Sequence, residues 1–201
     1  MEIDPSKLKG KHVFLELVSE SHREPIRLIA KNERIWEFNK MLLIDENYNR
    51  MYDAYFDAAL DKKQMGGQQA FVMRKVKDDS IIGMTRLYEI NSKDKHAMIG
   101  YTWYVPSVWG KVYNKESKFL LLRYIFETLA FNRAELRAVG QNIRSQKAIE
   151  KIGGTREGVL RKHGYRNDGE IKDTVIYGII DDDWKCVKEK LMQLIGESEK
   201  D

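Results

Sequence analysis

The chain has little cysteine and no long apolar run. Its single cysteine, Cys186, cannot form an internal disulfide or a cysteine-rich metal site. No stretch approaches the roughly 18 uncharged apolar residues of a membrane span. The first residues are neither basic nor strongly apolar, as a secretory leader would be. These absences predict a protein of the reducing cytoplasm, with no membrane partner and no metal site.

Proline and an excess of one charge are also scarce. Only three prolines occur, and no repeat or low-complexity segment marks a linker, so residues 1–201 predict a single domain. Thirty-five basic residues against 31 acidic ones leave a net charge of +4, spread evenly along the chain. So small an excess gives no support to specific nucleic-acid binding.

The pattern of apolar residues predicts a mixed α/β (α+β) fold. Alternation with a period of two predicts seven strands, near residues 12–17, 70–76, 81–90, 97–104, 134–139, 156–166 and 171–180. A capping box of Ser21 and Glu24 predicts a helix that begins there. Helical spacing predicts four more helices, over 47–63 with Gly66-Gly67 at its end, over 115–130, over 145–151 and over 183–196. A helix between the fourth and fifth strands implies a parallel crossover, and the other connections favour antiparallel neighbours.

The segment from Trp109 to Lys115 is a candidate anion site. It joins a strand end to a buried helix, where backbone amides lack helical partners and lie at the positive end of the helix dipole. Lys111 and Lys115 add positive charge. A plain turn with Asn114 as the helix N-cap explains the same residues. The residues alone leave both interpretations open, because one glycine, Gly110, does not make a phosphate-binding motif.

Two polar features follow along the chain. Asn142 stands three residues before Ser145 at a helix start, so we expect its side chain to accept from the Ser145 amide, worth about 1 kcal/mol. The same pair could instead present an amide and a hydroxyl to a ligand. A histidine ring ordinarily changes its charge near neutral pH, so His163 could take a proton from an amine, although a strand histidine among basic neighbours is more often an exposed polar residue.

In their order, these segments resemble the GNAT acetyltransferases, in particular the ribosomal-protein N-acetyltransferase (RimJ/RimL-type) branch. The resemblance covers about residues 10–185 and is most specific between residues 97 and 184. It is carried by Ile99-Gly100-Tyr101-Thr102-Trp103, the loop after Trp109, the buried helix ending at Ala130, Asn142-x-x-Ser145, Ile152-Gly153, Glu157-Gly158-x-Leu160-Arg161 and Asp182-Asp183-Trp184.

The resemblance implies a GNAT-like sheet that splays between its fourth and fifth strands, with acetyl-CoA as co-substrate in the gap. Val112 and Asn114 stand where the family usually has glycine or another small residue, and valine does not easily take a positive φ. The positions that match the family's cofactor-binding residues are Trp103, Tyr104, Val105, Trp109, Gly110, Lys111, Val112, Tyr113, Asn114, Asn142 and Ser145.

The resemblance also implies direct attack of a primary amine on the thioester. Ser145 matches the hydroxyl that protonates the departing thiolate, and His163 is the candidate base, with Tyr165 and a relayed water behind it. The acceptor is a protein N-terminal α-amine, including that of a ribosomal protein, or a small-molecule amine. An α-amine is favoured because its pKa of about 7.7–8.0 requires less help than that of a lysine, near 10.4.

Some alternatives remain open at this stage. A catalytically silent module that binds acyl-CoA or docks on the ribosome is the second hypothesis for function. Trp36, Phe38 and Tyr48 fit either an acceptor groove or core packing. A monomer and a homodimer fit the sequence equally.

Overall fold

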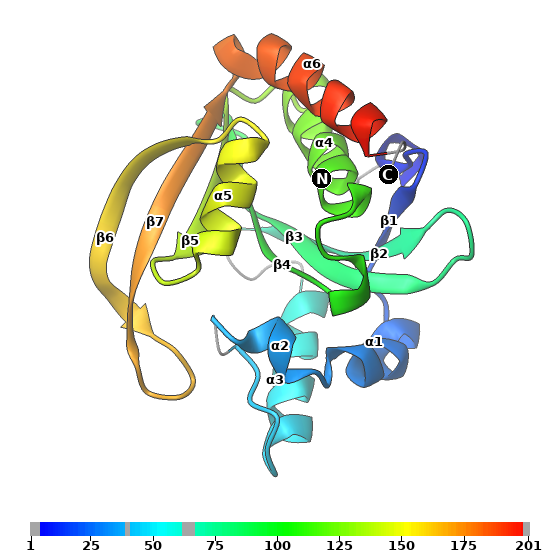
Figure 1. Cartoon of the computed structure of the whole chain (residues 1–201), viewed down its shortest axis with the longest axis vertical. Helices are drawn as coiled ribbons and strands as arrows, with labels where there is room; N and C mark the ends of the chain where they lie inside the picture. The colour runs from blue at the N-terminus through cyan, green and yellow to red at the C-terminus, as the bar shows by residue number, and fades with distance from the viewer. Residues whose placement is uncertain (1–4, 39–40, 62–66, 199–201) are drawn as a thin grey trace.

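Seven strands form one open sheet in the computed structural model, which describes residues 5–38, 41–61 and 67–198 (Figure 1). Their order across the sheet is β1-β2-β3-β4-β5-β7-β6. Only β4 and β5 pair in parallel; the other neighbours are antiparallel. The predicted seven-stranded, mostly antiparallel mixed sheet is therefore confirmed. The strands are β1 (Val13–Leu17), β2 (Gln68–Lys75), β3 (Ile81–Asn91), β4 (His96–Tyr104), β5 (Arg133–Val139), β6 (Thr155–Tyr165) and β7 (Ile171–Ile180).

The helices cover both faces of this sheet. Along β2, Phe71 and Met73 belong to one apolar cluster and Ala70 and Val72 to a second, so alternate side chains point to opposite faces. The first cluster is closed by α4 (Val112–Arg123), α5 (Ile143–Lys151) and α6 (Asp181–Glu197), the second by α1 (Arg23–Ala30), α2 (Glu33–Trp36) and α3 (Tyr48–Leu60). Short helical turns are η1 (Pro5–Leu8), η2 (Glu20–His22), η3 (Pro106–Val108) and the π-helical η4 (Tyr124–Thr128).

Two of the predicted helix starts are wrong. Ser21 does not cap α1: the Ser19 amide donates to His22 Nδ1 at 3.0 Å, and the η2 turn leads into the helix at Arg23. Asn114 does not cap α4, which begins at Val112, so Asn114 lies in its first turn. The chain turns early there because Gly110 takes φ +78°, after which Lys111 is extended and enters the helix.

Three further differences concern the helices. The helix α2 was not predicted, since its single turn is too short to show a period. The predicted helix over 115–130 is an α-helix only to Arg123 and continues as the π-helical turn η4. Beyond η4, Ala130 takes φ +51°. The helix α3 ends at Leu60; the predicted end, residues 62–63 and Gly66, lies outside the described residues.

Candidate active site

The strands β4 and β5 pair over only part of their length. Their register runs from His96 opposite Arg133 to Ile99 opposite Leu136, although β4 continues to Tyr104 and β5 to Val139. Beyond Ile99 the two strands part. The expected splay is present, and it leaves main-chain groups of both strands facing a gap instead of a neighbouring strand.

A β-bulge in β4 marks the point where the strands separate. Arg86 of β3 pairs with Gly100 and Met84 with Trp103, so β4 carries one residue more than β3 across this stretch. Tyr101 takes φ +51°, a region that a bulky residue rarely occupies. Such a bulge bends its strand and redirects its backbone groups. The extra residue therefore turns the end of β4 away from β5.

The backbone of Tyr104 faces the gap. The Val105 amide donates to the Ile82 carbonyl of the neighbouring β3 at 2.9 Å. Because main-chain groups alternate between the two edges of a strand, the N–H and C=O of Tyr104 point to the opposite edge. The indole Nε1 of Trp109 donates to that carbonyl at 2.8 Å. Of the three predicted pantetheine-binding positions, Trp103 and Tyr104 line the cavity described next and Val105 does not.

A cavity of about 640 Å³ occupies the gap. This volume is within the range of about 300–1,000 Å³ for sites of small molecules and cofactors. Many wall residues come from the end of β4, from β5 and from the starts of α4 and α5. The cavity therefore extends from the gap between the strands to the N-termini of both helices, which pack on the same face of the sheet (Figure 1). We call this cavity the cleft.

The loop before α4 lies at the mouth of the cleft. Trp109, Gly110 and Asn114 line the cleft, whereas Lys111, Val112 and Tyr113 do not. The first-turn amides of α4 nonetheless lack intrahelical acceptors and sit at the positive end of the helix. Val112 is helical and needs no positive φ, because Gly110 alone makes the turn. The departure from the family's glycine pattern thus leaves the helix start intact.

Asn142 and Ser145 lie on the opposite wall, at the start of α5. The Asn142 side chain accepts from the Ser145 amide at 3.0 Å, so the predicted N-cap is confirmed. Both residues line the cleft. The Ser145 hydroxyl has no hydrogen-bond partner within the described part of the chain and can bind a ligand.

His163 and Tyr165 reach the cleft from the edge strand β6. The Nδ1 atom of His163 lies 3.1 Å from Thr174 Oγ1 of β7. A bulge at this point bends β6: Leu160 pairs with Thr174, but Gly164 pairs with Lys172, and Lys162 takes φ +50°. His163 is exposed and Tyr165 is 72% exposed, so both stand at the rim.

The three aromatic residues predicted to line either an acceptor groove or the core lie in different places. Trp36 is buried and lines the cleft; its ring packs on Trp103 with centroids 5.5 Å apart. Tyr48 belongs to the core. Phe38 lies under the guanidinium of Arg144, which also stands 4.1 Å from the ring centroid of Trp109. The two Arg144 contacts connect the start of α5 with the segment after α2 and with the loop before α4.

Sequence reasoning missed Lys118. This α4 residue is 6% exposed, lines the cleft, and donates from Nζ to Thr102 Oγ1 of the β4 bulge at 2.7 Å. Burial lowers the pKa of its side chain to about 7. The sequence did carry a signal for its burial. The buried residues Leu121, Leu122 and Ile125 follow Lys118 by three, four and seven positions, so all four lie on one face of the helix.

The described residues around the cleft are more basic than acidic. Among the described residues, the only carboxylate on the wall is that of Glu89, at the exposed rim. The basic groups are those of Lys118, Arg137, Arg144, His163 and Lys172. Within the described residues, no group of three or more His, Cys, Asp or Glu side chains could hold a metal ion. No helix of that part of the chain is long and apolar enough to cross a membrane.

Comparison with known proteins agrees with this geometry. Residues 12–155 match the model of a family described as an acetyltransferase (GNAT) domain. The chain is 27% identical over 182 residues to a Bacillus subtilis (strain 168) protein named "Putative ribosomal N-acetyltransferase YdaF"; the match covers 89% of this chain and 97% of that protein.

Solved structures share the fold. A GCN5-related N-acetyltransferase from Brucella melitensis superposes with a TM-score of 0.82 at 20% identity, over 94% of this chain and 84% of that one. A spermidine N-acetyltransferase from Vibrio cholerae, in complex with CoA and spermine, gives a TM-score of 0.67 at 20% identity, over 86% of this chain and 98% of that one.

Proposed function

Because the chain belongs to the GNAT family of acetyltransferases, we propose that it holds acetyl-CoA in the cleft between β4 and β5 and transfers the acetyl group to a primary α-amine. The observation that carries this proposal is the parting of β4 and β5 after Ile99, with the α4 and α5 N-termini at its mouth. The acceptor is the N-terminal amine of a protein or a small molecule with a single amine of similar basicity.

The cleft suits each part of acetyl-CoA. The unpaired edge of β4 offers main-chain groups to the amides of the pantetheine arm, as a neighbouring strand would. The α4 N-terminus beside Gly110 suits the pyrophosphate, with Lys111 close by and Arg144 across the cleft at α5. The residues present therefore fit this co-substrate, which supplies the activated acetyl group.

The chain's own groups then serve the reaction by position and charge. The Tyr104 amide faces the gap and is placed to donate to the thioester oxygen as negative charge develops there. Holding the amine and the thioester together removes much of the entropic barrier. Ser145, whose hydroxyl is unpartnered among the described residues, donates to the departing sulfur, and His163 holds the acceptor from the rim.

The charge around the cleft favours an acceptor with one amine. Arg137 and Lys172 lie on the wall, where Glu89 is the only carboxylate among the described residues. Glu135, outside the cleft, accepts a hydrogen bond from Arg137 Nε at 2.7 Å and partly offsets its charge. A polyamine would bring several positive charges to this basic surface, and like charges repel. The name of the Bacillus subtilis relative, a putative ribosomal N-acetyltransferase, supports this choice of acceptor.

Two measurements test the proposed function. Acetyl-CoA at about 100 times its Kd stabilises a protein that binds it by about 2.7 kcal/mol, which is read as a rise in Tm of a few degrees. Thiol release is then followed with a peptide bearing a free N-terminus, with the same peptide blocked at its N-terminus but bearing a lysine, and with spermidine.

We expect turnover with the free N-terminal peptide and little with the other two acceptors. No Tm shift would contradict the cofactor site. A Tm shift without thiol release from any acceptor would instead identify a silent acyl-CoA-binding module. Faster turnover of spermidine would overturn the assignment of the acceptor class.

A further inference from the structure

We propose that Lys118 is a catalytic residue, whose neutral amine takes the proton from the attacking amine and returns it to the departing thiolate. The inference rests on the proposed function, because it assigns the proton-transfer group for that reaction. It moves the role of base from His163, at the exposed rim, to a residue inside the cleft.

The position of Lys118 is fixed at the point where the strands part. Its Nζ donates to Thr102 Oγ1 at 2.7 Å, and Thr102 Oγ1 lies 2.8 Å from Thr85 Oγ1 of β3. Thr102 belongs to the β4 bulge, and both Lys118 and Thr102 line the cleft. The amine therefore lies on the wall next to the strand edge that we assign to the thioester.

In the part of the chain that the structure describes, no carboxylate pairs with Lys118 and holds it in its charged form. Within the described residues it makes no ion pair, and burial is the sole cause of its lowered pKa. Four charged groups on the surrounding elements have partners of their own. Glu116 of α4 accepts from the Val13 amide of β1, and the ion pairs are Glu16 of β1 with Arg74, Glu127 of η4 with Lys188 of α6, and Arg137 of β5 with Glu135. Lys7 of η1 is exposed, Glu89 of β3 lies at the rim, and His163 of β6 is within hydrogen-bond distance of Thr174.

The remaining titratable neighbour is uncharged. The Tyr104 hydroxyl is bonded to Ser117, and burial raises its pKa well above the usual range, so it stays protonated. Lys118 therefore titrates between a neutral amine, which accepts a proton, and an ammonium, which donates one. A group whose pKa lies near the working pH serves both steps with little loss.

The steps balance in atoms and charge. The acceptor nitrogen bonds to the carbonyl carbon, and the carbonyl π electrons move to oxygen. Lys118 Nζ accepts one proton from that nitrogen. The C–S bond then breaks with its electron pair on sulfur, the carbonyl re-forms, and the sulfur receives the proton from the Lys118 ammonium, with Ser145 donating a hydrogen bond. The products are an N-acetyl amide and CoA thiol, and Lys118 is neutral again.

The first test compares kcat as a function of pH in Lys118→Met, Lys118→Arg and the parent. Because kcat reports ionisations in the bound complex, the titration of the free acceptor amine does not enter it. We expect parent kcat to rise with pH through about 7 and then level off. Lys118→Met is expected to lower kcat by about 10²- to 10⁴-fold and to abolish this rise.

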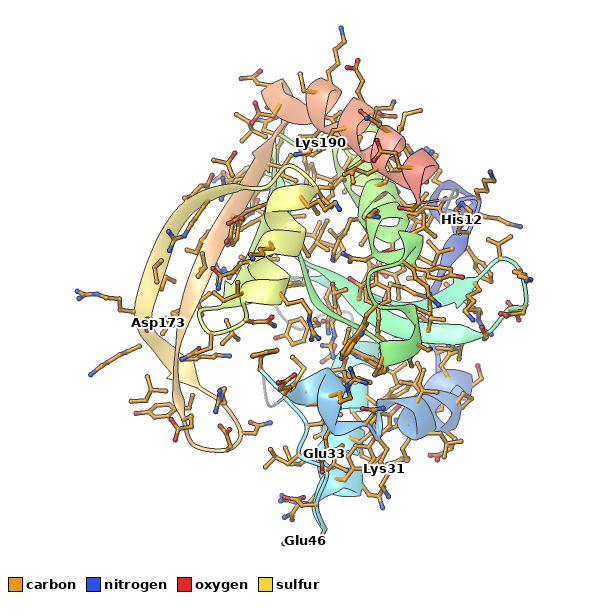
Figure 2. All side chains as sticks on the ribbon, viewed as in Figure 1. His12, Lys31, Glu33, Glu46, Asp173 and Lys190 are labelled. Carbon is orange, nitrogen blue, oxygen red and sulfur yellow. The ribbon has the colours of Figure 1, made fainter. Side chains whose placement is uncertain are left out.

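Lys118→Arg is expected to fail similarly, because a guanidinium does not deprotonate at these pH values. Lys190→Met, on the exposed surface of α6, is the matched control and should keep the parent profile (Figure 2). Parent-like kcat and pH dependence in Lys118→Met would overturn the proposal. So would a profile that is lost in His163→Asn and kept in Lys118→Met.

A second measurement separates this inference from the proposed function. NMR of lysine labelled at Cε and Nζ, assigned with Lys118→Met, gives the titration midpoint of Lys118 with and without acetyl-CoA. A midpoint near 7 that moves when acetyl-CoA binds supports the proposal even where no tested amine is acetylated. A midpoint near the ordinary lysine value, or one that acetyl-CoA leaves unchanged, overturns it. Circular dichroism confirms that each variant is folded.

Discussion

The carboxylate of Glu116 accepts a hydrogen bond from the backbone amide of Val13 at 2.7 Å, across 103 positions of sequence. The amides of Lys11 and His12 donate to the same carboxylate at 2.8 Å each. A Cβ at Gly10 would lie 2.5 Å from Glu116 Cδ, so glycine is what allows this approach. One side chain thus ties α4, whose first turn borders the cleft, to the start of β1.

Glu116→Gln should destabilise the fold. The substitution removes the charge from three hydrogen bonds and turns an amide group toward backbone donors, at an expected cost of about 1.5–3 kcal/mol. Urea denaturation measures the change in the free energy of unfolding. Glu189→Gln, at an exposed site on α6, is the control and should change it by less than about 0.5 kcal/mol. Equal effects of the two variants would show that the Glu116 contacts do not stabilise the protein.

Gly110→Ala should weaken the start of α4. No atom lies within 4 Å of a Cβ at this position, so the cost comes from φ +78° alone and is about 1–2 kcal/mol. We also expect a higher Kd for acetyl-CoA, measured by calorimetry. Gly196→Ala, in the helix α6 and equally unobstructed, should instead stabilise the protein by about 0.5–1 kcal/mol. An unchanged Kd in Gly110→Ala would place the pyrophosphate elsewhere.

Ser145→Ala should lower kcat more than it weakens acetyl-CoA binding. The cap of α5 uses the backbone amide of Ser145, so this substitution leaves the cap intact and removes only the hydroxyl. Asn142→Ala is the complementary variant, because it removes the cap and should cost about 1 kcal/mol of stability. Steady-state kinetics and thermal denaturation separate the two effects. Parent-like kcat in Ser145→Ala would remove the hydroxyl from the mechanism.

Lys118 should make stability depend on pH. Its pKa is about 7 in the folded protein and near 10.5 when unfolded, so between these values the unfolded chain binds more protons and stability rises with pH. The difference in unfolding free energy between the parent and Lys118→Met should therefore move in the parent's favour by up to about 1.4 kcal/mol per pH unit. Urea denaturation at pH 6 and pH 9 measures it, and a difference independent of pH would contradict the lowered pKa.

Features set by neighbouring residues were predictable from the sequence. Alternation located the strands, and the spacing of Asn142 and Ser145 predicted their hydrogen bond. The bulge at Tyr101 was not predictable, because it depends on how β4 pairs with β3, and no local residue demands it. The start of α4 was missed because Asn114 is a good N-cap, while the positive φ of Gly110 begins the helix earlier. Lys118 was missed because a lysine within a helix is ordinarily solvent-exposed.

The strands β4 and β5 are paired over only four residues, so the sheet consists of two parts, β1 to β4 and β5 to β7, that are joined along a short edge. A ligand that lies along the open edge takes the place of a neighbouring strand and connects the two parts of the sheet through hydrogen bonds to main-chain peptide groups. Peptide groups are the same whatever side chains they carry, so such main-chain contacts do not depend on which side chains the strands carry. In the binding mode that we propose, the side chains around the cleft can therefore differ with the acceptor while the main-chain contacts to the acetyl donor stay the same.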